Sequence, residues 1–293
     1  MAKNIAVVGS GSWGTAMAVH LAEIGHNITL WSWKKEESDA IAKNRENKEF
    51  LPDVKIPENV LFTSDISCVR GKDIVVLVPP SQSMRVTAKS MSKFADNNTI
   101  LVILSKGLEN GTLKTMSDVV AEEMPNNPIV VMSGPSHAEE VSRNIPTANV
   151  AVSKNPDAAK IVQNEFMNEY FRIYTSSDVL GVELGGAVKN VIALCAGIVD
   201  GIGFGDNTKA ALMTRGMREI SRLGVIMGAN EETFNGLAGI GDLIVTCTSM
   251  HSRNRRAGIL IGQGHTLDET IEKVRMVVEG VYSTKARYEL AKK

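Results

Sequence analysis

Cysteine and aromatic residues are scarce in this chain of 293 residues, and neither sign of charge prevails. The three cysteines, Cys68, Cys195 and Cys247, show neither a CxxC pair nor the spacing of metal ligands. We therefore expect reduced, mostly buried thiols, as in a cytoplasmic protein, rather than a disulfide framework. The sequence also shows no cluster of metal-ligating residues, so no bound metal is expected.

The formal net charge is only −1, from 32 basic and 33 acidic residues. Such a balance gives no general attraction to nucleic acid or to an anionic membrane surface. No stretch of 18 apolar residues lacks both charge and glycine, so no membrane span is expected. The opening residues, MAKNIAVVGSGSWG, lack the long apolar region of a signal peptide, which again favours a cytoplasmic location.

Hydrophobic residues make up 43% of the chain, enough for a core without disulfides or metals. In the N-terminal part, short β-branched runs alternate with helical patterns, which predicts a parallel sheet buried on both faces. The runs lie at 4–9, 27–31, 73–78, 99–104, 128–134 and 147–152, with a shorter candidate at 171–175.

The pattern changes near residue 178, beyond which helical periodicity broken by glycines replaces the strands. Ser176, Ser177 and Asp178 are candidate helix N-caps. Residues 206–228 predict a long amphipathic helix ending near Gly228. We therefore predict an α/β fold, with a Rossmann-like doubly wound sheet followed by an all-α domain. The expected domains are 1–178 and 179–293.

A glycine loop follows the first predicted strand. Gly9, Gly11 and Gly14 match G-x-G-x-x-G, and the residues after them predict a helix. In that context Gly9 permits a tight turn, Gly11 lets backbone N–H groups approach a pyrophosphate, and Gly14 lets helix and strand pack closely. The loop predicts dinucleotide binding by the N-terminal domain; a plain βα turn is the alternative.

The second predicted strand lacks the acid that binds the ribose of NAD in many such folds. Trp31, Ser32 and Trp33 occupy its end, and Lys34 and Lys35 follow. The lysines could accept a 2′-phosphate, with a hydrogen bond from Ser32, and this favours NADP over NAD. A solvated start of a helix is the alternative interpretation of the two lysines.

Lys189 is the only cation in the apolar helical stretch ELGGAVKNVIAL. Because helical side chains lean toward the N-terminus, its ammonium should lie over Gly185 and Gly186, and we expect open space there. Burial lowers a lysine's pKa and suits it to proton transfer near neutral pH. Asp242, in a glycine turn, could orient the ammonium, with Thr246 one helical turn later. A snorkelling or ion-paired structural lysine is the alternative.

Three further segments carry groups suited to a phosphate or a carbonyl oxygen. Lys106 follows the strand 99–104, and the SGPSHAEEV segment, with Gly134 and Ser136, follows the strand residues 128–132. Open α/β sheets bind ligands at such strand ends. Arg253, Arg255 and Arg256 follow Ser252, a candidate N-cap, and an arginine at a helix N-terminus suits a phosphate. No aromatic residues lie among these bases, so nucleic-acid binding is not expected; a solvated basic turn is the alternative.

Together these segments resemble the bacterial NAD(P)-dependent sn-glycerol-3-phosphate dehydrogenases over nearly the whole chain. The resemblance implies reversible reduction of dihydroxyacetone phosphate to sn-glycerol 3-phosphate, a phospholipid precursor. The most specific part of the resemblance is the block 181–216. The other matching segments are GSGSWGTAMA, SKGLENGT, SGPSHAEEV, LAGIGDLIVTCTS and SRNRR.

The resemblance also implies roles for individual residues. Lys189 would be the general acid/base, completed by Lys106 and Asp242. Substrate contacts would come from Lys106, Gly134, Ser136, Lys189, Asn190, Asp242, Thr246, Ser252, Arg253 and Asn254, with Arg253 and Asn254 on the phosphate. Cofactor contacts would come from Gly9, Gly11, Ser12, Trp13, Gly14, Trp33, Lys106, Ala138, Arg253, Val277 and Glu279.

Two departures from the family pattern accompany the resemblance. Relatives usually carry arginine near position 33, where this chain has Trp33, and they run further past the C-terminal residues of this sequence. A homodimer is an expectation from fold analogy alone. Two other functions remain open at this point: a β-hydroxyacid dehydrogenase with a similar lysine–asparagine helix, and a non-catalytic dinucleotide sensor, which would need neither Lys189 nor Asp242.

Overall fold

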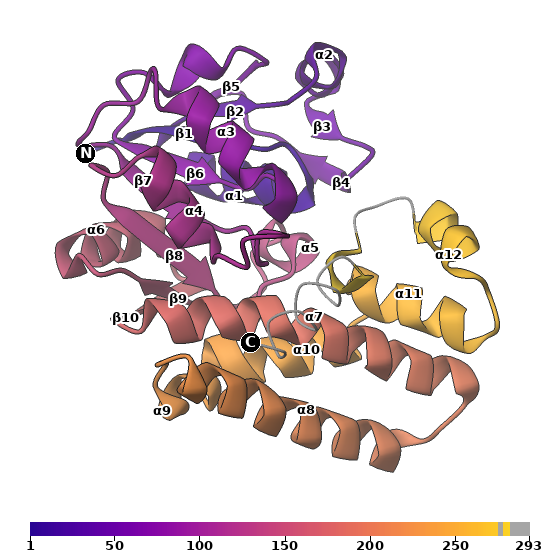
Figure 1. Cartoon of the computed structure of the whole chain (residues 1–293). Helices are drawn as coiled ribbons and strands as arrows, with labels where there is room; N and C mark the ends of the chain where they lie inside the picture. The colour runs from indigo at the N-terminus through magenta and orange to yellow at the C-terminus, as the bar shows by residue number, and fades with distance from the viewer. Residues whose placement is uncertain (275–277, 282–293) are drawn as a thin grey trace. The chain divides into compact units, whose positions relative to one another are not determined.

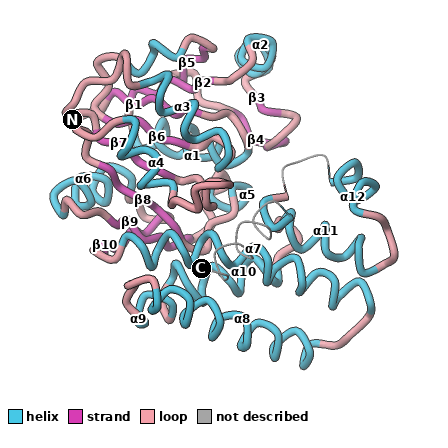
Figure 2. The backbone as a smooth tube through the Cα atoms, in the orientation of Figure 1, coloured by secondary structure: helices cyan, strands magenta, loops and turns pink. Residues whose placement is uncertain are grey.

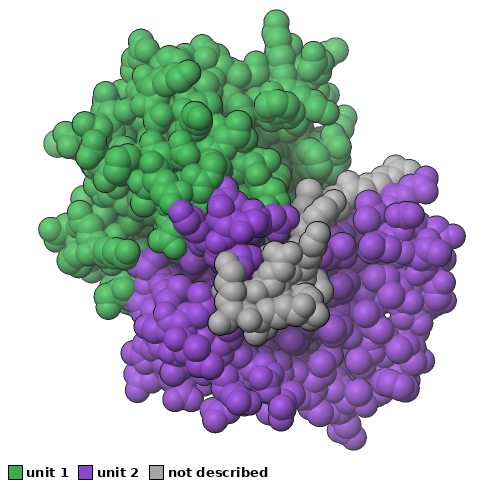
Figure 3. Space-filling view, viewed as in Figure 1, with its two compact units in different colours: residues 1–105, 116–132, 136–177 green, residues 106–115, 133–135, 178–293 purple. Residues whose placement is uncertain are grey.

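A computed structural model describes residues 1–274 and 278–281. The chain forms two compact units, shown in green and purple in Figure 3. The first comprises residues 1–105, 116–132 and 136–177; the second comprises 106–115, 133–135 and 178–293. Two short segments from the N-terminal part of the chain thus belong to the second unit. The division of labour between domains 1–178 and 179–293 stays a prediction.

The first unit is built on an eight-stranded sheet in the order β10-β9-β8-β7-β6-β1-β2-β5. Within this sheet, every strand pair with a described register is parallel. This confirms the Rossmann-like sheet, and the chain order reverses beside β1, since β2 and β6 flank it. The strands are β1 (Asn4–Val8), β2 (Asn27–Trp31), β5 (Val60–Thr63), β6 (Ile74–Leu77), β7 (Ile100–Ile103), β8 (Ile129–Ser133), β9 (Thr147–Val152) and β10 (Phe171–Ser176).

Helices of the first unit pack in neighbouring pairs, α1 with α5 and α3 with α4 (Figures 1 and 2). Central strands are apolar because both faces are covered; all four residues of β6 and of β7 are buried. The helices are α1 (Ser12–Ile24), α2 (Lys35–Asn44), α3 (Met84–Met91), α4 (Met116–Glu123), α5 (Ala138–Val141) and α6 (Pro156–Phe166), with 3₁₀ turns at Ile66–Val69 and Ser81–Ser83.

Three strands were not predicted from the sequence: the edge strand β5 and a small antiparallel pair, β3 (Glu46–Asn47) and β4 (Leu51–Lys55). In β5 only Val60 is buried, while Leu61 is 66% exposed. An edge strand needs no continuous apolar run, because only part of it faces the core. The strand therefore left little signal in the sequence.

The second unit is helical, as the sequence predicted. Asp178 caps α7 by accepting a hydrogen bond from the backbone N–H of Gly181, and α8 ends just before Gly228, which has a φ of +99°. The helices are α7 (Val179–Ile202), α8 (Asp206–Ile226), α9 (Glu231–Phe234), a π-helical turn (Leu237–Gly241), α10 (Asp242–Thr248), α11 (Arg253–Gly262) and α12 (Leu267–Val274).

Helix α7 is long and apolar enough to cross a membrane by length and composition alone. Two thirds of its most apolar window (67%) is nevertheless buried inside the protein, and α8, α10 and α11 pack against it. A buried core helix passes the same composition test as a membrane span. The packing therefore accounts for the apolar character of α7.

Four glycines bring α7 and α11 into close contact (Figure 1). Gly197 and Gly201 lie one turn apart on α7, and Gly258 and Gly262 lie one turn apart on α11. A Cβ on any of them would overlap a backbone carbonyl of the facing helix. The absence of these side chains fixes α11, and with it the residues at its N-terminus, directly against α7.

Candidate active site

Lys189 lies in the middle of α7 with only 5% of its surface exposed. Its ammonium donates to Asp242 Oδ1 and, at 2.8 Å, to Thr246 Oγ1. Both acceptors come from α10, which packs against α7, and they lie one helical turn apart on one face. The lysine therefore does not snorkel to the surface; its ammonium pairs with the Asp242 carboxylate inside the second unit.

Asp242 also binds a second cation. Lys106 Nζ donates to Asp242 Oδ2 at 2.7 Å and to the backbone carbonyl of Gly134 at 3.3 Å. Asp242 is the first residue of α10 and is 1% exposed. Its two carboxylate oxygens bind one lysine each, Oδ1 with Lys189 and Oδ2 with Lys106. One buried carboxylate thus fixes two ammonium groups beside each other.

Gly185 and Gly186 do not leave open space beside Lys189, and this expectation was wrong. A Cβ on Gly185 would lie 2.5 Å from the carbonyl oxygen of Ala238, and one on Gly186 would lie 2.8 Å from Ser133 Oγ. The glycines instead let the π-helical turn and the Lys106 side chain approach α7. Their effect is to bring the partners of Lys189 close.

Burial and charge shift the ionisation of this cluster. Burial lowers the pKa of Lys189 to about 7, with a further contribution from Lys106, against the opposing pull of Asp242. Burial also raises the pKa of Asp242, but the two lysines outweigh that effect and the net shift is downward. The cluster therefore combines a carboxylate that stays ionised with an amine that can exchange a proton near neutral pH.

A group of amides lies beside this cluster. Asn254 Nδ2 donates to Asn190 Oδ1 at 3.0 Å, and the backbone N–H of Gly280 donates to Asn254 Oδ1 at 2.8 Å. Asn190 directly follows Lys189 in α7, so the amides continue the polar site along the helix.

Helix α11 presents its N-terminus at these amides. Ser252 caps the helix by accepting from the N–H of Arg255 at 3.2 Å. Arg253 is the first residue of the helix, and no acid occupies the first turn. An arginine in a first helical turn that carries no acid of its own favours an anion such as phosphate.

The glycine loop of the first unit fits a dinucleotide. Gly9 has a φ of +119°, and a Cβ there would lie 2.8 Å from the carbonyl oxygen of Val78; one on Gly14 would overlap the carbonyl of Gly9. A Cβ on Gly11, by contrast, would meet nothing within 4 Å. Helix α1 begins just after Gly11 without a side-chain cap or an acid in its first turn. Open space at a positive helix end is what a pyrophosphate requires.

The other expected contact residues belong to several different elements. Trp33 is 76% exposed between β2 and α2, and Ser136 accepts a hydrogen bond from Asn149 Nδ2 at 3.3 Å. Ala138, 7% exposed, opens α5. Glu279 is half-buried next to Gly280, whereas the expected contact at Val277 lies outside the described residues.

Two features of this region were not predicted from the sequence. Ser133 is 2% exposed, and its hydroxyl has no hydrogen-bond partner in the described part of the chain. Asp200 of α7 forms ion pairs with two side chains. Nε and Nη2 of Arg255 lie 2.8 and 2.7 Å from its Oδ2, and Nζ of Lys209 in α8 lies 2.6 Å from its Oδ1. The paired glycines four residues apart in 197–201 and 258–262 were a signal that could have revealed the α7–α11 contact.

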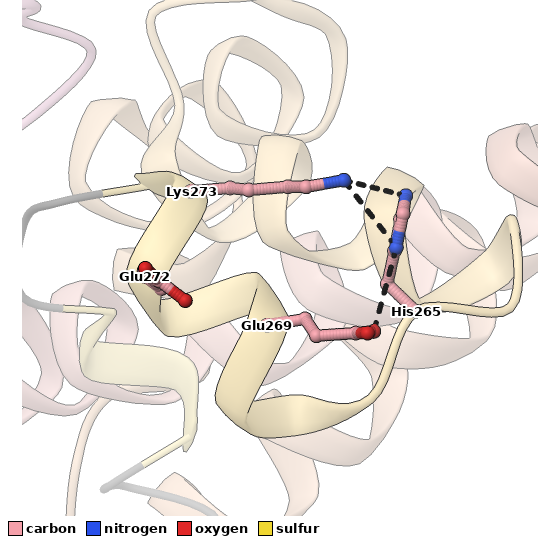
Figure 4. A pocket seen from close by; sticks show the side chains of 4 residues that line it. All are labelled: His265, Glu269, Glu272 and Lys273. Atoms are coloured by element: carbon pink, nitrogen blue, oxygen red, sulfur yellow. Dashed lines mark hydrogen bonds and ion pairs between the residues drawn. The ribbon is translucent and has the colours of Figure 1, made fainter.

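A further pocket is lined by His265, Glu269, Glu272 and Lys273 on and before α12 (Figure 4). Lys273 Nζ lies 3.0 Å from His265 Nε2, and His265 Nδ1 lies 3.5 Å from Glu269 Oε2. His265 thus contacts both Lys273 and Glu269, and Lys273 is exposed, unlike the buried Lys189.

The comparisons with known proteins agree with this geometry. Family models described as NAD-dependent glycerol-3-phosphate dehydrogenase N-terminus and C-terminus match residues 4–159 and 178–293. Curated glycerol-3-phosphate dehydrogenases [NAD(P)+] are similar: that of Fusobacterium nucleatum is 55% identical over 293 residues, covering 99% of this chain and 88% of that protein. That of Thermoanaerobacter sp. is 56% identical, covering 98% and 87%.

A solved structure shows the same fold. The crystal structure of glycerol-3-phosphate dehydrogenase from Coxiella burnetii has a TM-score of 0.96 at 38% identity, covering 99% of this chain and 90% of that one. The family models account for both the sheet-based N-terminal part and the helical C-terminal part. The chain therefore belongs to the NAD(P)-dependent glycerol-3-phosphate dehydrogenase family.

Proposed function

We propose that this chain reduces dihydroxyacetone phosphate reversibly to sn-glycerol 3-phosphate, with Lys189 as the general acid/base. The product is the backbone of glycerophospholipids, and its supply for phospholipid synthesis is the role we assign. The observation that carries the proposal is the buried cluster of Lys189, Asp242 and Lys106. Names of relatives up to 56% identical support the substrate. A cytoplasmic location and a homodimer stay predictions.

In the proposed mechanism each residue of the cluster has a separate role. A bound NAD(P)H supplies hydride, and negative charge then develops on the carbonyl oxygen of the substrate. Lys189 Nζ gives its proton to that oxygen and takes it back in the oxidative direction. Asp242 orients the ammonium, and Lys106 adds a second positive charge. The lowered pKa of Lys189, about 7, makes both directions of proton transfer accessible near neutral pH.

The phosphate end of the substrate is assigned to the N-terminus of α11. Arg253 begins the helix, and Asn254 joins it to Asn190 of α7 through a hydrogen bond of 3.0 Å. Because Asn190 follows Lys189, a phosphate at this end would hold the adjoining carbonyl at a fixed distance from the ammonium. We assign the remaining substrate contacts to Gly134, Ser136, Thr246 and Ser252.

The relatives do not support the two other functions considered from the sequence, and residues of the site also argue against both. A β-hydroxyacid dehydrogenase would bind a carboxylate and would not need the basic SRNRR segment at a helix N-terminus. A dinucleotide sensor would not need a buried lysine whose pKa is lowered to about 7. The site therefore favours a phosphorylated ketone as substrate and an enzyme over a sensor.

The test is turnover of dihydroxyacetone phosphate with NADH or NADPH, followed by absorbance, for the wild type and for Lys189→Met. Removing Lys189 leaves Asp242 paired with Lys106, so the variant should fold. We expect turnover to fall by a factor on the order of 10³ or more while cofactor affinity stays within about twofold. Lys93→Met, which removes an exposed lysine, is the matched control. Normal turnover in Lys189→Met, or faster turnover of a β-hydroxyacid, refutes the proposal.

A further inference from the structure

A glutamate in the first turn of α2, Glu37, contacts the glycine loop. Glu37 Oε1 accepts a hydrogen bond from Ser10 Oγ, and Ser10 lies between Gly9 and Gly11. The backbone carbonyl of Ser10 is itself held by Asn47 Nδ2 at 2.7 Å. The half-buried carboxylate is thus fixed against the segment that we expect to approach the cofactor.

No cation offsets this carboxylate directly, since Glu37 forms no salt bridge with any residue in the described ranges 1–274 and 278–281. Lys34 and Lys35 lie nearby in sequence, but both side chains are exposed. Glu36, in the same first turn, is exposed as well. A ligand that reaches the loop beside Ser10 therefore meets a negative charge held in place.

Dinucleotide-binding folds commonly use an acid after the second strand to accept a hydrogen bond from the adenosine ribose. The end of β2 carries none, since it reads Trp31-Ser32-Trp33. We propose that Glu37 takes over this task from the next helix and determines cofactor specificity. Its second oxygen accepts from the ribose hydroxyls of NADH, and its charge opposes the 2′-phosphate of NADPH, so this chain binds NADH more tightly.

This inference rests on the proposed function only in requiring dinucleotide binding. It reverses the preference for NADP that Lys34 and Lys35 suggest. Two exposed lysines are mobile, hydrated charges, whereas Glu37 is fixed by a hydrogen bond to the loop itself. Ser32, the third residue of the NADP prediction, is fully buried rather than exposed beside the two lysines.

The test is the dissociation constants of NADH and NADPH, measured by calorimetry on the substrate-free protein. Adenosine 2′,5′-bisphosphate and 5′-AMP, which carry no nicotinamide, repeat the comparison without any possible turnover. Glu37→Gln keeps an oxygen that can accept from Ser10 but removes the charge. Glu36→Gln removes a charge from the same helical turn and is the matched control, since both changes alter the helix N-terminus alike.

We expect the wild type to bind NADH more tightly than NADPH. In Glu37→Gln the ratio of the two dissociation constants should shift toward NADPH by about tenfold, the size expected for one charge contact at a protein–water boundary. Glu36→Gln should leave the ratio within about twofold. A wild type that prefers NADPH, or equal changes in both affinities in Glu37→Gln, overturns the inference. Failure of the wild type to bind either nucleotide defeats the cofactor assignment as well.

Discussion

Gly11 of the first unit and the glycines between α7 and α11 of the second unit have opposite roles, although nothing in the sequence distinguishes them. In the first unit, Gly11 keeps a space open, because a Cβ there would meet nothing within 4 Å. In the second unit, Gly197 and Gly258 let two helices touch, because a Cβ on either would overlap the facing backbone. Gly11 leaves room for a ligand, whereas Gly197 and Gly258 allow backbone contact between α7 and α11. A glycine's role therefore depends on which atoms surround the position of its missing side chain.

Gly258→Ala should show the largest effect on stability. Its new Cβ would overlap the carbonyl of Leu194 and lie 2.8 Å from the N of Ile198, so α11 would have to move away from α7. Overpacking of this kind outweighs the gain in helix propensity, and we expect the free energy of unfolding to fall by about 2 kcal/mol. Denaturant unfolding measures this loss. An unchanged free energy of unfolding would show that the helices are not in backbone contact.

Gly11→Ala should instead affect binding and leave the fold intact. Gly11 has an extended backbone (φ −65°, ψ −177°), which alanine adopts without strain. The added methyl group would enter the space assigned to the pyrophosphate, and we expect cofactor affinity to fall by about tenfold or more, as for a lost backbone approach. Titration with NADH checks this expectation.

Gly205→Ala is the matched control and should have the smallest effect. Gly205 also precedes a helix in an extended conformation (φ −81°, ψ −180°), and a Cβ there would also meet nothing within 4 Å. Both substitutions should change stability by under about 1 kcal/mol, since they alter an N-cap alike. Only Gly11→Ala should weaken cofactor binding; an equal loss in both variants would contradict the comparison.

Much of the fold was predictable because its signals are local. The apolar strands, the caps at Asp178 and Ser252 and the long helix ending before Gly228 each depend on a few neighbouring residues. Strand β5 was not predicted, because an edge strand buries little of its surface and so lacks a continuous apolar run. The close packing around Gly185 was not predicted either, since it depends on Ala238, which is distant in sequence.

In the candidate site, too, local features were predictable and contacts between distant segments were not. The pairing of Lys189 with Asp242 was anticipated from two unusual positions, a cation in an apolar helix and an acid in a glycine turn. The contact between Glu37 and Ser10 could not be, because nothing in an ordinary acidic first turn of a helix marks one glutamate from the next. Contacts between segments remote in sequence require the structure.

The most direct test of the central claim is the pH dependence of kcat/KM in both directions, with Lys189→Met as reference. The lowered pKa of Lys189, about 7, means that the ammonium needed for ketone reduction is present below that pH and lost above it. We predict that reduction slows as pH rises through about 7, while oxidation of sn-glycerol 3-phosphate speeds up over the same interval, and that the residual rate of Lys189→Met lacks both changes. If the wild type and Lys189→Met share one pH profile, Lys189 is not the proton donor.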